Sequence, residues 1–315
     1  MPEERTIRRG GRGGTLPPDR VQPEHVRTRT IGVITRDRTV HGAAAALRGI
    51  ERAARMGGYS LRVETLRRAD QHTVAAAFAT LARQSVTGVI AAAALPPTAL
   101  LRLPADLPVV AVQPDAAGII PAVVVDQAAG ARAAVAHLLG LGHEQVWHVS
   151  GAEDWPETHS RVAGWRAAHR AFRRMAPPVL EGDWTARSGY AAGLRLAHRP
   201  DVTAVFAASD QMALGLLRAF AERGILVPGD ISVVGFDDIP EAAYLHPPLT
   251  TIRQNHDEIG RRCVTALLEF LAVTGHAGLI GQEADGSLRP RLVLRDTTGP
   301  AAAARAGHEE HCSPV

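Results

Sequence analysis

Short apolar runs alternate along this chain with longer segments whose apolar residues recur at every third or fourth position. The short runs are rich in Val, Ile and Ala and predict buried β-strands, whereas the longer periodic segments predict amphipathic helices. The first part of the chain accordingly predicts strands at 31–35, 61–66, 88–92, 109–112 and 122–125, with helices at 43–56 and 72–84.

The second part of the chain repeats the alternation. It predicts helices at 127–141, 159–172, 186–197, 209–223 and 255–273, and strands at 146–150, 179–182, 204–207 and 231–236. Strands that alternate with helices form parallel sheets with helices packed on both faces. The predicted fold class is therefore α/β, with two Rossmann-like lobes.

Polar residues directly follow two strands of the second predicted lobe. Ser209 and Asp210 come after the strand at 204–207, and Asp237 and Asp238 come after the strand at 231–236. The carboxyl ends of parallel strands face a crevice, so these residues are expected to point polar groups into it. A small-ligand site is predicted at this edge of the sheet.

Composition limits the classes of protein to consider. The 315 residues, 46% of them hydrophobic, are enough for two domains with full cores. No apolar run reaches the ~18 residues of a membrane span, and no apolar signal segment follows the N-terminal arginines, so we expect a cytoplasmic protein with no membrane partner. Cys263 and Cys312 form neither a disulfide framework nor a spaced zinc motif, and no cofactor or metal is expected.

The basic charge of the chain is concentrated at its start. All 35 basic residues are arginine, and residues 1–30 hold seven of them against four acids. The other 28 arginines are balanced by 28 acids, from the totals of 35 and 32, so residues 31–315 have no basic surplus for nucleic acid. The sequence pI of about 9.4 is mostly a property of the first segment.

Several segments carry a resemblance to a known family. They read RTIGVITRD, LRGIERAARMGGYSL, VDQAAGARAAVAHLLGLGHEQVWHVSG, RVAGW, EGDWTARSGY, VFAASDQMALG, ISVVGFDD and PPLTTIRQ, in that order along residues 29–298. These segments closely resemble the lactose repressor and galactose repressor family of bacterial transcription regulators. Several matched segments in the same order are far more specific than one motif.

The resemblance implies a periplasmic-binding-protein-like fold of type I, in which the chain crosses between the lobes three times. The crossings are expected near Asp126, Thr251 and Glu283, and they make a hinged clamp around a ligand. The N-terminal lobe is then expected to comprise 29–126 and 254–283, and the C-terminal lobe 127–253 and 284–298. Residues 1–28 and 299–315 are expected to be disordered tails.

The resemblance also implies which residues contact a sugar. Arg161 of RVAGW matches the arginine that reaches into the cleft, and Asp237 matches the carboxylate that accepts ligand hydroxyls; a surface arginine and a turn residue are the alternatives. Trp184 of EGDW matches a cleft aromatic. Trp155, which follows another strand, is a candidate second wall, and Asp154 beside it is a candidate hydroxyl acceptor. Core residues are the alternative for both tryptophans, and a solvated loop acid is the alternative for Asp154.

Three residues depart from the family pattern, and one further candidate stands after the first strand. Ser209 replaces the usual Asn, Gln113 a cleft Asp and His256 a stacking Phe. A shorter hydroxyl makes a direct contact at 209 less secure, and an imidazole at 256 would make binding pH-sensitive. Arg36 is expected at the cleft floor, where it would suit an acidic or phosphorylated ligand.

The motifs of common enzymes are missing from the sequence. There is no G-x-S-x-G elbow, no phosphate loop, no HExxH and no G-x-G-x-x-G after the first strand, and Asp237 and Asp238 are adjacent rather than facing each other across a gap. We therefore expect a homodimeric sensor of a sugar or related metabolite, which is not an enzyme. A stand-alone solute-binding protein is the alternative.

Family members begin with a helix-turn-helix and a hinge helix that bind DNA. Residues 1–28 contain four Pro, four Gly and no apolar stripe of helical period, so no helix-turn-helix is expected in them. Operator DNA is accordingly an expected partner only if a helix-turn-helix is encoded upstream.

Overall fold

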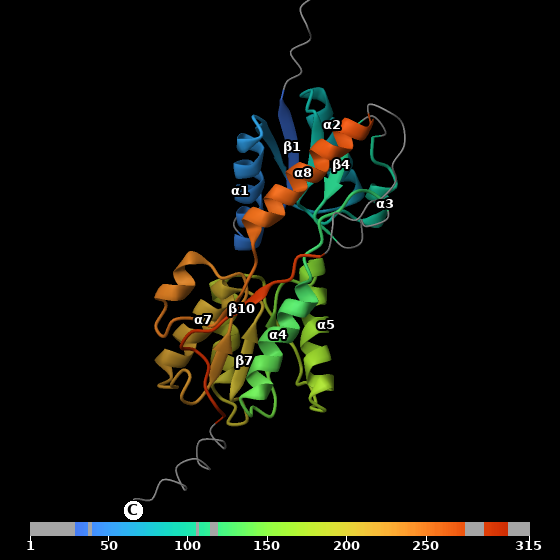
Figure 1. Ribbon diagram of the computed structural model, residues 1–315. Helices are drawn as coiled ribbons and strands as arrows, with labels where there is room; N and C mark the ends of the chain where they lie inside the picture. Colours follow the sequence, from blue (N-terminus) through green and yellow to red (C-terminus); the bar gives the residue numbers. More distant parts are fainter. Residues whose placement is uncertain (1–28, 37–39, 105–106, 114–118, 275–286, 302–315) are drawn as a thin grey trace, which may run out of the picture.

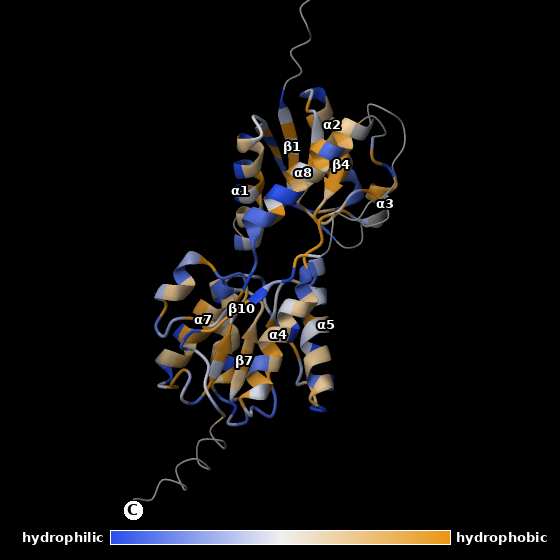
Figure 2. Ribbon diagram, viewed as in Figure 1, coloured by the Kyte–Doolittle hydropathy of each residue, from blue (hydrophilic) through white to orange (hydrophobic). Residues whose placement is uncertain are grey.

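The computed structural model describes residues 29–36, 40–104, 107–113, 119–274 and 287–301. They form two α/β lobes that lie end to end and are joined by a waist of extended segments (Figure 1). Apolar residues are concentrated on the strands and on the helices that cover them, whereas hydrophilic residues gather at the waist (Figure 2).

The N-terminal lobe is built on four parallel strands in the order β2-β1-β3-β4. These are β1 (Thr30–Thr35), β2 (Ser60–Thr65), β3 (Gly88–Ala91) and β4 (Val109–Ala111). Helices α1 (His41–Met56) and α8 (His256–Thr274) cover one face, and α2 (Gln71–Arg83) and the short α3 (Pro97–Leu100) cover the other. Along β1, Ile31 and Val33 pack beneath α1 and α8 whereas Ile34 packs beneath α2, so the strand is apolar on both sides.

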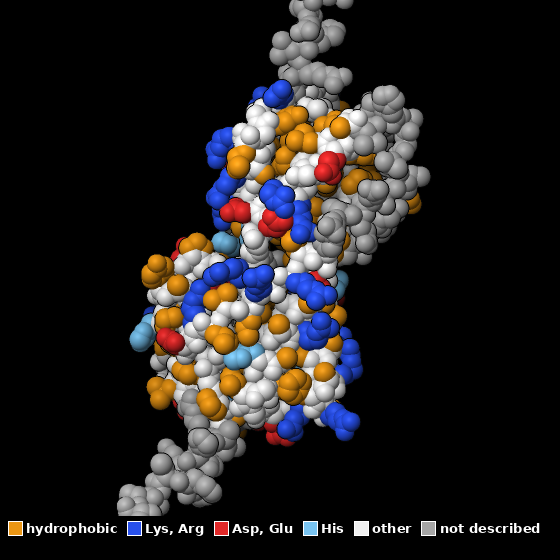
Figure 3. Space-filling view, in the orientation of Figure 1, with side chains coloured by type: hydrophobic (Ala, Val, Ile, Leu, Met, Phe, Trp, Pro, Cys, Tyr) orange, Lys and Arg blue, Asp and Glu red, His pale blue; other side chains and the backbone are white. Residues whose placement is uncertain are grey.

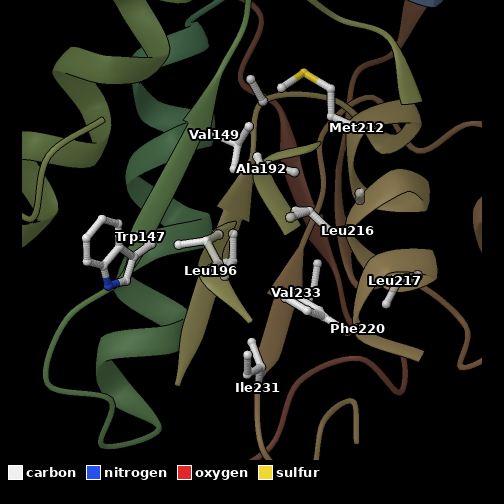
Figure 4. Packing of buried hydrophobic residues seen from close by; sticks show 14 of the residues in the cluster. Trp147, Val149, Ala192, Leu196, Met212, Leu216, Leu217, Phe220, Ile231 and Val233 are labelled. Atoms are coloured by element: carbon white, nitrogen blue, oxygen red, sulfur yellow. The ribbon is translucent and has the colours of Figure 1, made fainter. Parts of the chain in front are cut away.

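The C-terminal lobe repeats this plan with strand order β6-β5-β7-β8. Its strands are β5 (Trp147–Ser150), β6 (Leu180–Glu181), β7 (Ala204–Ala207) and β8 (Ser232–Val234). Helices α4 (Gln127–Gly140) and α5 (Pro156–Ala171) cover one face, and α6 (Ala186–Leu196) and α7 (Asp210–Glu222) the other. Figure 4 shows the hydrophobic core between this sheet and helices α6 and α7, where Leu216 and Phe220 of α7 lie over the sheet near Leu196 and Val233.

The waist contains a short antiparallel ribbon of β9 (Thr251–Arg253) and β10 (Arg291–Val293). Bridges from Thr250 to Val234 and from Arg253 to Asp237 attach β9 to the C-terminal lobe, and α8 then packs on α1 of the N-terminal lobe. The chain therefore passes from the C-terminal lobe to the N-terminal lobe just after Arg253. Val125 bridges Leu288, so the chain at the first crossing runs beside the segment that precedes β10.

The α/β fold class predicted from the sequence is confirmed, and most element ends differ by one or two residues. The predicted strand at 122–125 is wrong, because this segment makes only isolated bridges, Ala122 to Ala111 and Val125 to Leu288. Helix α5 begins at Pro156, earlier than predicted, since proline is well suited to the first position of a helix. Helix α3 was not predicted, and it is a single turn.

Some expectations fall on parts of the chain that the structure does not describe. The expected tail at 1–28, residues 302–315 of the second tail and the crossing near Glu283 lie outside the described residues. Among the residues that are described, no helix is both long and apolar enough to cross a membrane.

Candidate functional site

A cleft between the two lobes is lined by residues of both. The empty volume between its walls, including the solvent-filled mouth, is about 1020 Å³. The N-terminal lobe contributes Arg36, Val40, Gly42, Ala43, Ala46, Ala92, Ala93, Ala94, Val112, Gln113, Val125, His256 and Ile259. The C-terminal lobe contributes Gln127, Trp155, Pro156, Glu157, Ser160, Arg161, Trp184 and Asp237, and Gln254 of the second crossing lies beside them.

The two walls of the cleft differ in chemistry. Most of the N-terminal wall consists of alanine, valine and isoleucine side chains, whereas the C-terminal wall carries two carboxylates, a guanidinium, two amides, a hydroxyl and two indoles. The polar wall arises because β5, β6, β7 and β8 are parallel and end at the same edge, so the loops that follow them meet there.

Arg161 lies at the centre of the polar wall and is 4% exposed. Its Nε donates to Gln127 Oε1 at 3.1 Å, Nη1 donates to the Ala208 carbonyl, and Nη2 lies 3.7 Å from Asp237 Oδ1. Gln254 closes the network, since its Nε2 donates to Asp237 Oδ1 at 2.7 Å while its Oε1 accepts from Gln127 Nε2 at 2.8 Å. Residues from four separate segments thus hold one another in place.

Burial dominates the electrostatics of this network. It lowers the pKa of Arg161, and the neighbouring carboxylate of Asp237 opposes that shift by favouring the charged form. The guanidinium carbon lies 3.7 Å from the centre of the Phe236 ring and 5.3 Å from that of Trp184. The cation is thus surrounded by aromatic faces, which attract it without using its hydrogen-bond donors.

The backbone beside the cleft adopts uncommon conformations. Asp237 has φ +108°, Asp238 has φ +57° and Trp184 has φ +73°. Residues with side chains rarely occupy positive φ, and such positions cluster where surrounding contacts hold a functional group. At Trp184 the indole lies against Gly151, where an added Cβ would be 2.1 Å from a ring carbon.

Two acids that were expected in the crevice are used elsewhere. Asp210 is fully buried; its Oδ2 accepts from the Ile239 amide at 2.8 Å and its Oδ1 from Thr251 Oγ1 at 2.5 Å. Burial, followed by the repulsion of Asp237, raises the pKa of Asp210 to about 8. Asp238 bonds to Arg253 and Arg295 at 2.5 and 2.6 Å. Both acids fasten β9 and the chain after β10 to the C-terminal lobe, and neither lines the cleft.

Two tryptophans and an arginine form another part of the wall. The rings of Trp155 and Trp184 are 5.6 Å apart in an edge-to-face arrangement. The guanidinium of Arg36, from the other lobe, lies 4.4 Å from the centre of the Trp155 ring. Trp184 is 7% exposed, so most of its surface is packed in the core while the remainder lines the cleft. Trp184 is therefore both a core residue and a residue of the cleft wall.

Comparison with known proteins supports the family resemblance directly. Residues 135–298, just over half of the chain, match the model of the periplasmic binding protein-like domain. The lactose operon repressor of Klebsiella pneumoniae is 32% identical over 282 residues, which are 87% of this chain and 77% of that protein. The chain belongs to the lactose repressor and galactose repressor family of transcription regulators.

Solved structures of this family share the fold. The lac repressor dimer bound to operator and the anti-inducer ONPF has a TM-score of 0.77 at 29% identity, over 90% of this chain and all of that one. A family regulator from Enterococcus faecium with bound ribose has a TM-score of 0.74 at 28% identity, over 86% of this chain and 99% of that one. Such relatives are transcriptional repressors rather than enzymes.

Most of the residues singled out in this family member from its sequence meet at the cleft. Seven of the nine line it, namely Arg36, Gln113, Trp155, Arg161, Trp184, Asp237 and His256. Ser209 does not, because its hydroxyl caps α7 by accepting from the Met212 amide at 3.3 Å. Asp154 does not either, and its exposed carboxylate pairs with Arg36.

The two departures from the family pattern that line the cleft behave differently. The amide of Gln113 is bonded at both ends to the backbone of Leu95, at 2.5 and 3.1 Å, so this side chain shapes the wall. His256 begins α8, and its ring lies 6.2 Å from that of His41. Burial lowers the pKa of His256, although Asp237 acts in the opposite direction. Its imidazole is therefore held toward the neutral form.

Sequence reasoning missed four polar residues of the cleft: Gln127, Glu157, Ser160 and Gln254. Signals for them were present. Gln127 directly follows the predicted first crossing, Gln254 ends the PPLTTIRQ segment, and Glu157 lies one helical turn before Arg161 on the same face of α5. Among the described residues no group of His, Cys, Asp and Glu is arranged to hold a metal ion.

Proposed function

We propose that this chain is the effector-sensing and dimerisation core of a DNA-binding transcription regulator, and that its cleft binds a sugar or a related hydroxyl-bearing metabolite. The observation that carries the proposal is the buried network of Arg161, Asp237, Gln127 and Gln254, which lines the cleft beside two indoles. Sugar recognition needs charged and amide groups that bind pairs of hydroxyls. It also needs aromatic faces that pack against the C–H surface of the ring.

Each polar group has a role in this proposal. Arg161 and Gln254 approach Asp237 through Oδ1, and we expect Oδ2 to accept a hydrogen bond from a ligand hydroxyl. Arg161 is expected to donate to a second oxygen, since a guanidinium has five donors. Trp155 and Trp184 form the surface on which a ring lies, and Gln113 keeps the opposite wall in shape.

The proposed mechanism of regulation is linkage between the cleft and the arrangement of the lobes. The network joins Gln127, just after the first crossing, to Gln254, at the second. A ligand bound to these residues therefore contacts the hinge directly, and it favours whichever lobe arrangement it fits best. In a cytoplasmic homodimer, that bias is passed to DNA-binding segments and changes operator affinity.

Isothermal calorimetry against a panel of mono- and disaccharides that includes D-ribose tests the site. We expect at least one sugar to bind the parent protein, and Asp237→Asn to weaken that sugar roughly 10- to 100-fold, because it removes a charge-assisted hydrogen bond. Asp201→Asn, which removes an exposed acid of the same lobe, is the matched control and should leave affinity unchanged. Equal affinity of parent and Asp237→Asn for the best sugar would place the site elsewhere.

A further inference from the structure

One side chain of the N-terminal lobe reaches across the cleft and contacts the C-terminal lobe. Arg36 follows β1, and its Nη2 lies 2.6 Å from Asp154 Oδ2 in the loop after β5. Its Nη1 donates to the Asp154 carbonyl at 3.2 Å, and its guanidinium stacks on Trp155 at 4.4 Å. Three contacts from one guanidinium therefore connect the lobes through side chains that belong to none of the hinge segments.

The contact covers part of the cleft. Arg36 and Trp155 both line it, whereas Asp154 lies outside it. Arg36 is 8% exposed, but the side chain of Asp154 is 67% exposed. The guanidinium is thus enclosed between the lobes, and the carboxylate that binds it lies on the solvent-exposed side. Because Nη1 and Nη2 both already donate to Asp154, whose carboxylate neutralises the guanidinium, the structure gives no support to the expectation that Arg36 selects an acidic ligand.

A series of ring contacts leads from Arg36 to the polar network. Trp155 meets Trp184 edge to face at 5.6 Å, and Trp184 in turn lies 5.3 Å from the guanidinium of Arg161. A cation therefore stands at each end of this row and two indoles lie between them, in the order Arg36, Trp155, Trp184 and Arg161. A displacement of Arg36 uncovers the face of Trp155 on which it stacks, and Trp155 is part of the proposed sugar platform.

We propose that Arg36, Asp154 and Trp155 form a latch that holds the two lobes together in the absence of ligand. In this role Arg36 is a positioning residue, since it acts on the opposite lobe and not on the sugar. The latch goes beyond the proposed function: lobe closure by Arg36 is a property of the chain itself, and only its consequence for ligand exchange rests on the cleft being the sensor site.

The size of the effect follows from the exposure of the contact. A largely exposed ion pair and a partly desolvated cation–π contact together correspond to a roughly 5- to 30-fold shift in the ratio of closed to open molecules. The exposed carboxylate also makes the latch sensitive to salt, because ion pairs that reach solvent are weakened as the Debye length falls to roughly 3 Å at about 1 M salt. Salt should therefore open the parent protein and have little effect on a variant without the latch.

Distances between the lobes test the proposal without any ligand. Spin labels are placed at Leu101→Cys with Met175→Cys, and in a second protein at Met56→Cys with Leu226→Cys; all four positions are exposed, and each pair spans the two lobes. Cys312→Ser removes the cysteine of the terminal segment. Cys263 is fully buried, which raises the pKa of its thiol to about 12 and keeps it unlabelled.

Electron–electron distance measurements are expected to give a narrow distribution for the parent. Arg36→Ala should shift or broaden it in at least one label pair. Asp154→Asn and 1 M NaCl should each do so to a smaller extent, because they leave the stacking of Arg36 on Trp155 in place. Exchange of the charges, Arg36→Asp with Asp154→Arg, should restore part of the narrow distribution. Arg52→Ala is the matched control, because it removes an ion pair to Asp257 that lies within the N-terminal lobe.

Two results would overturn the latch. The first is an unchanged distribution in both label pairs for Arg36→Ala, and the second is an equal change in Arg52→Ala. Neither result bears on whether the cleft binds sugars, so failure of the latch is distinguishable from failure of the proposed function.

Discussion

Arg161 shows how one residue serves both the stability and the proposed function of this protein. Its guanidinium is buried, and it holds the Ala208 carbonyl, Gln127 and Asp237. Removal of one member of a buried ion pair leaves its partner without compensation in a medium where charges are poorly solvated. The contacts that we propose to orient Asp237 toward a ligand therefore also stabilise the fold.

Arg161→Ala is consequently expected to lower the free energy of unfolding by about 3 kcal/mol or more. Ser160→Ala, one residue earlier and also on the cleft wall, should change it by less than about 0.5 kcal/mol, because it removes a single half-buried hydroxyl. Urea unfolding followed by circular dichroism measures both. Similar values for the two variants would show that Arg161 is not part of a buried network.

Gly151→Ala tests the close approach of Trp184. The new Cβ would lie 2.1 Å from the indole, which is 7% exposed and packed against the core. We expect the substitution to destabilise the protein by about 1–3 kcal/mol and to weaken the best-binding sugar by displacing the ring. Gly140→Ala is the control, since nothing lies within 4 Å of its added Cβ. The idea fails if calorimetry gives equal sugar affinities for the two variants.

At the scale of elements, the regular parts of the fold were predictable and the connections were not. The strand at 204–207 was predicted with the bounds that the structure shows, because a short apolar run buried on both faces has a clear local pattern. The segment 122–125 has the same local pattern, yet it lies in a crossing where bridges to Ala111 and Leu288 replace a ladder. Such an outcome depends on residues far away in the sequence.

The cleft shows the same division. Arg161, Asp237 and Trp184 could be assigned from segments that resemble the family, whereas Gln127 and Gln254 acquire their roles only when two crossings lie together. Ser209 was misplaced because a residue at a strand end can either face the crevice or cap the next helix, and here its hydroxyl caps α7. Sequence position alone does not distinguish these two arrangements.

A buried histidine between β5 and β7 predicts that the protein loses stability in acid. His148 stacks on Phe206 with ring centroids 4.7 Å apart, and burial lowers its pKa to about 4. The unfolded chain, with an ordinary histidine pKa near 6.5, takes up the proton first as the pH falls. Stability that is present above pH 6.5 is therefore lost progressively between about pH 6.5 and 4, by about 3 kcal/mol in total.

His148→Leu removes this titration. Unfolding in urea at pH 7.0, 5.5 and 4.5 is expected to show the parent losing stability relative to the variant at each step. His159→Leu, at an exposed position on α5, should differ from the parent by a constant amount. The account would be wrong if the difference between His148→Leu and the parent did not change with pH. Asp210, whose raised pKa acts in the opposite direction, is common to all three proteins and cancels in the comparison.

At the scale of the whole molecule, the two lobes are held by the hinge segments and by contacts across the cleft. Arginine side chains are conspicuous around the waist (Figure 3), and Arg253 and Arg295 there are tied by Asp238 to the C-terminal lobe alone. Arg36 is different, because its partner belongs to the opposite lobe. A ligand shifts the lobe arrangement only by as much as it favours one state over the other, so contacts already made without ligand limit that shift.

This reasoning fixes the kinetic effect of the latch. If Arg36 bridges the lobes both before and after a sugar binds, its contribution is the same in the two closed states and cancels in the affinity. The open state that admits and releases the sugar lacks the contact, so removal of the contact should speed association and dissociation together.

Arg36→Ala is therefore expected to raise both rates roughly 5- to 30-fold while the Kd changes by less than about threefold. Stopped-flow fluorescence of Trp155 and Trp184, with the sugar that binds best in calorimetry, measures the two rates. A faster dissociation with unchanged association would mean that the bridge forms only around the ligand, and that the ligand-free cleft is open.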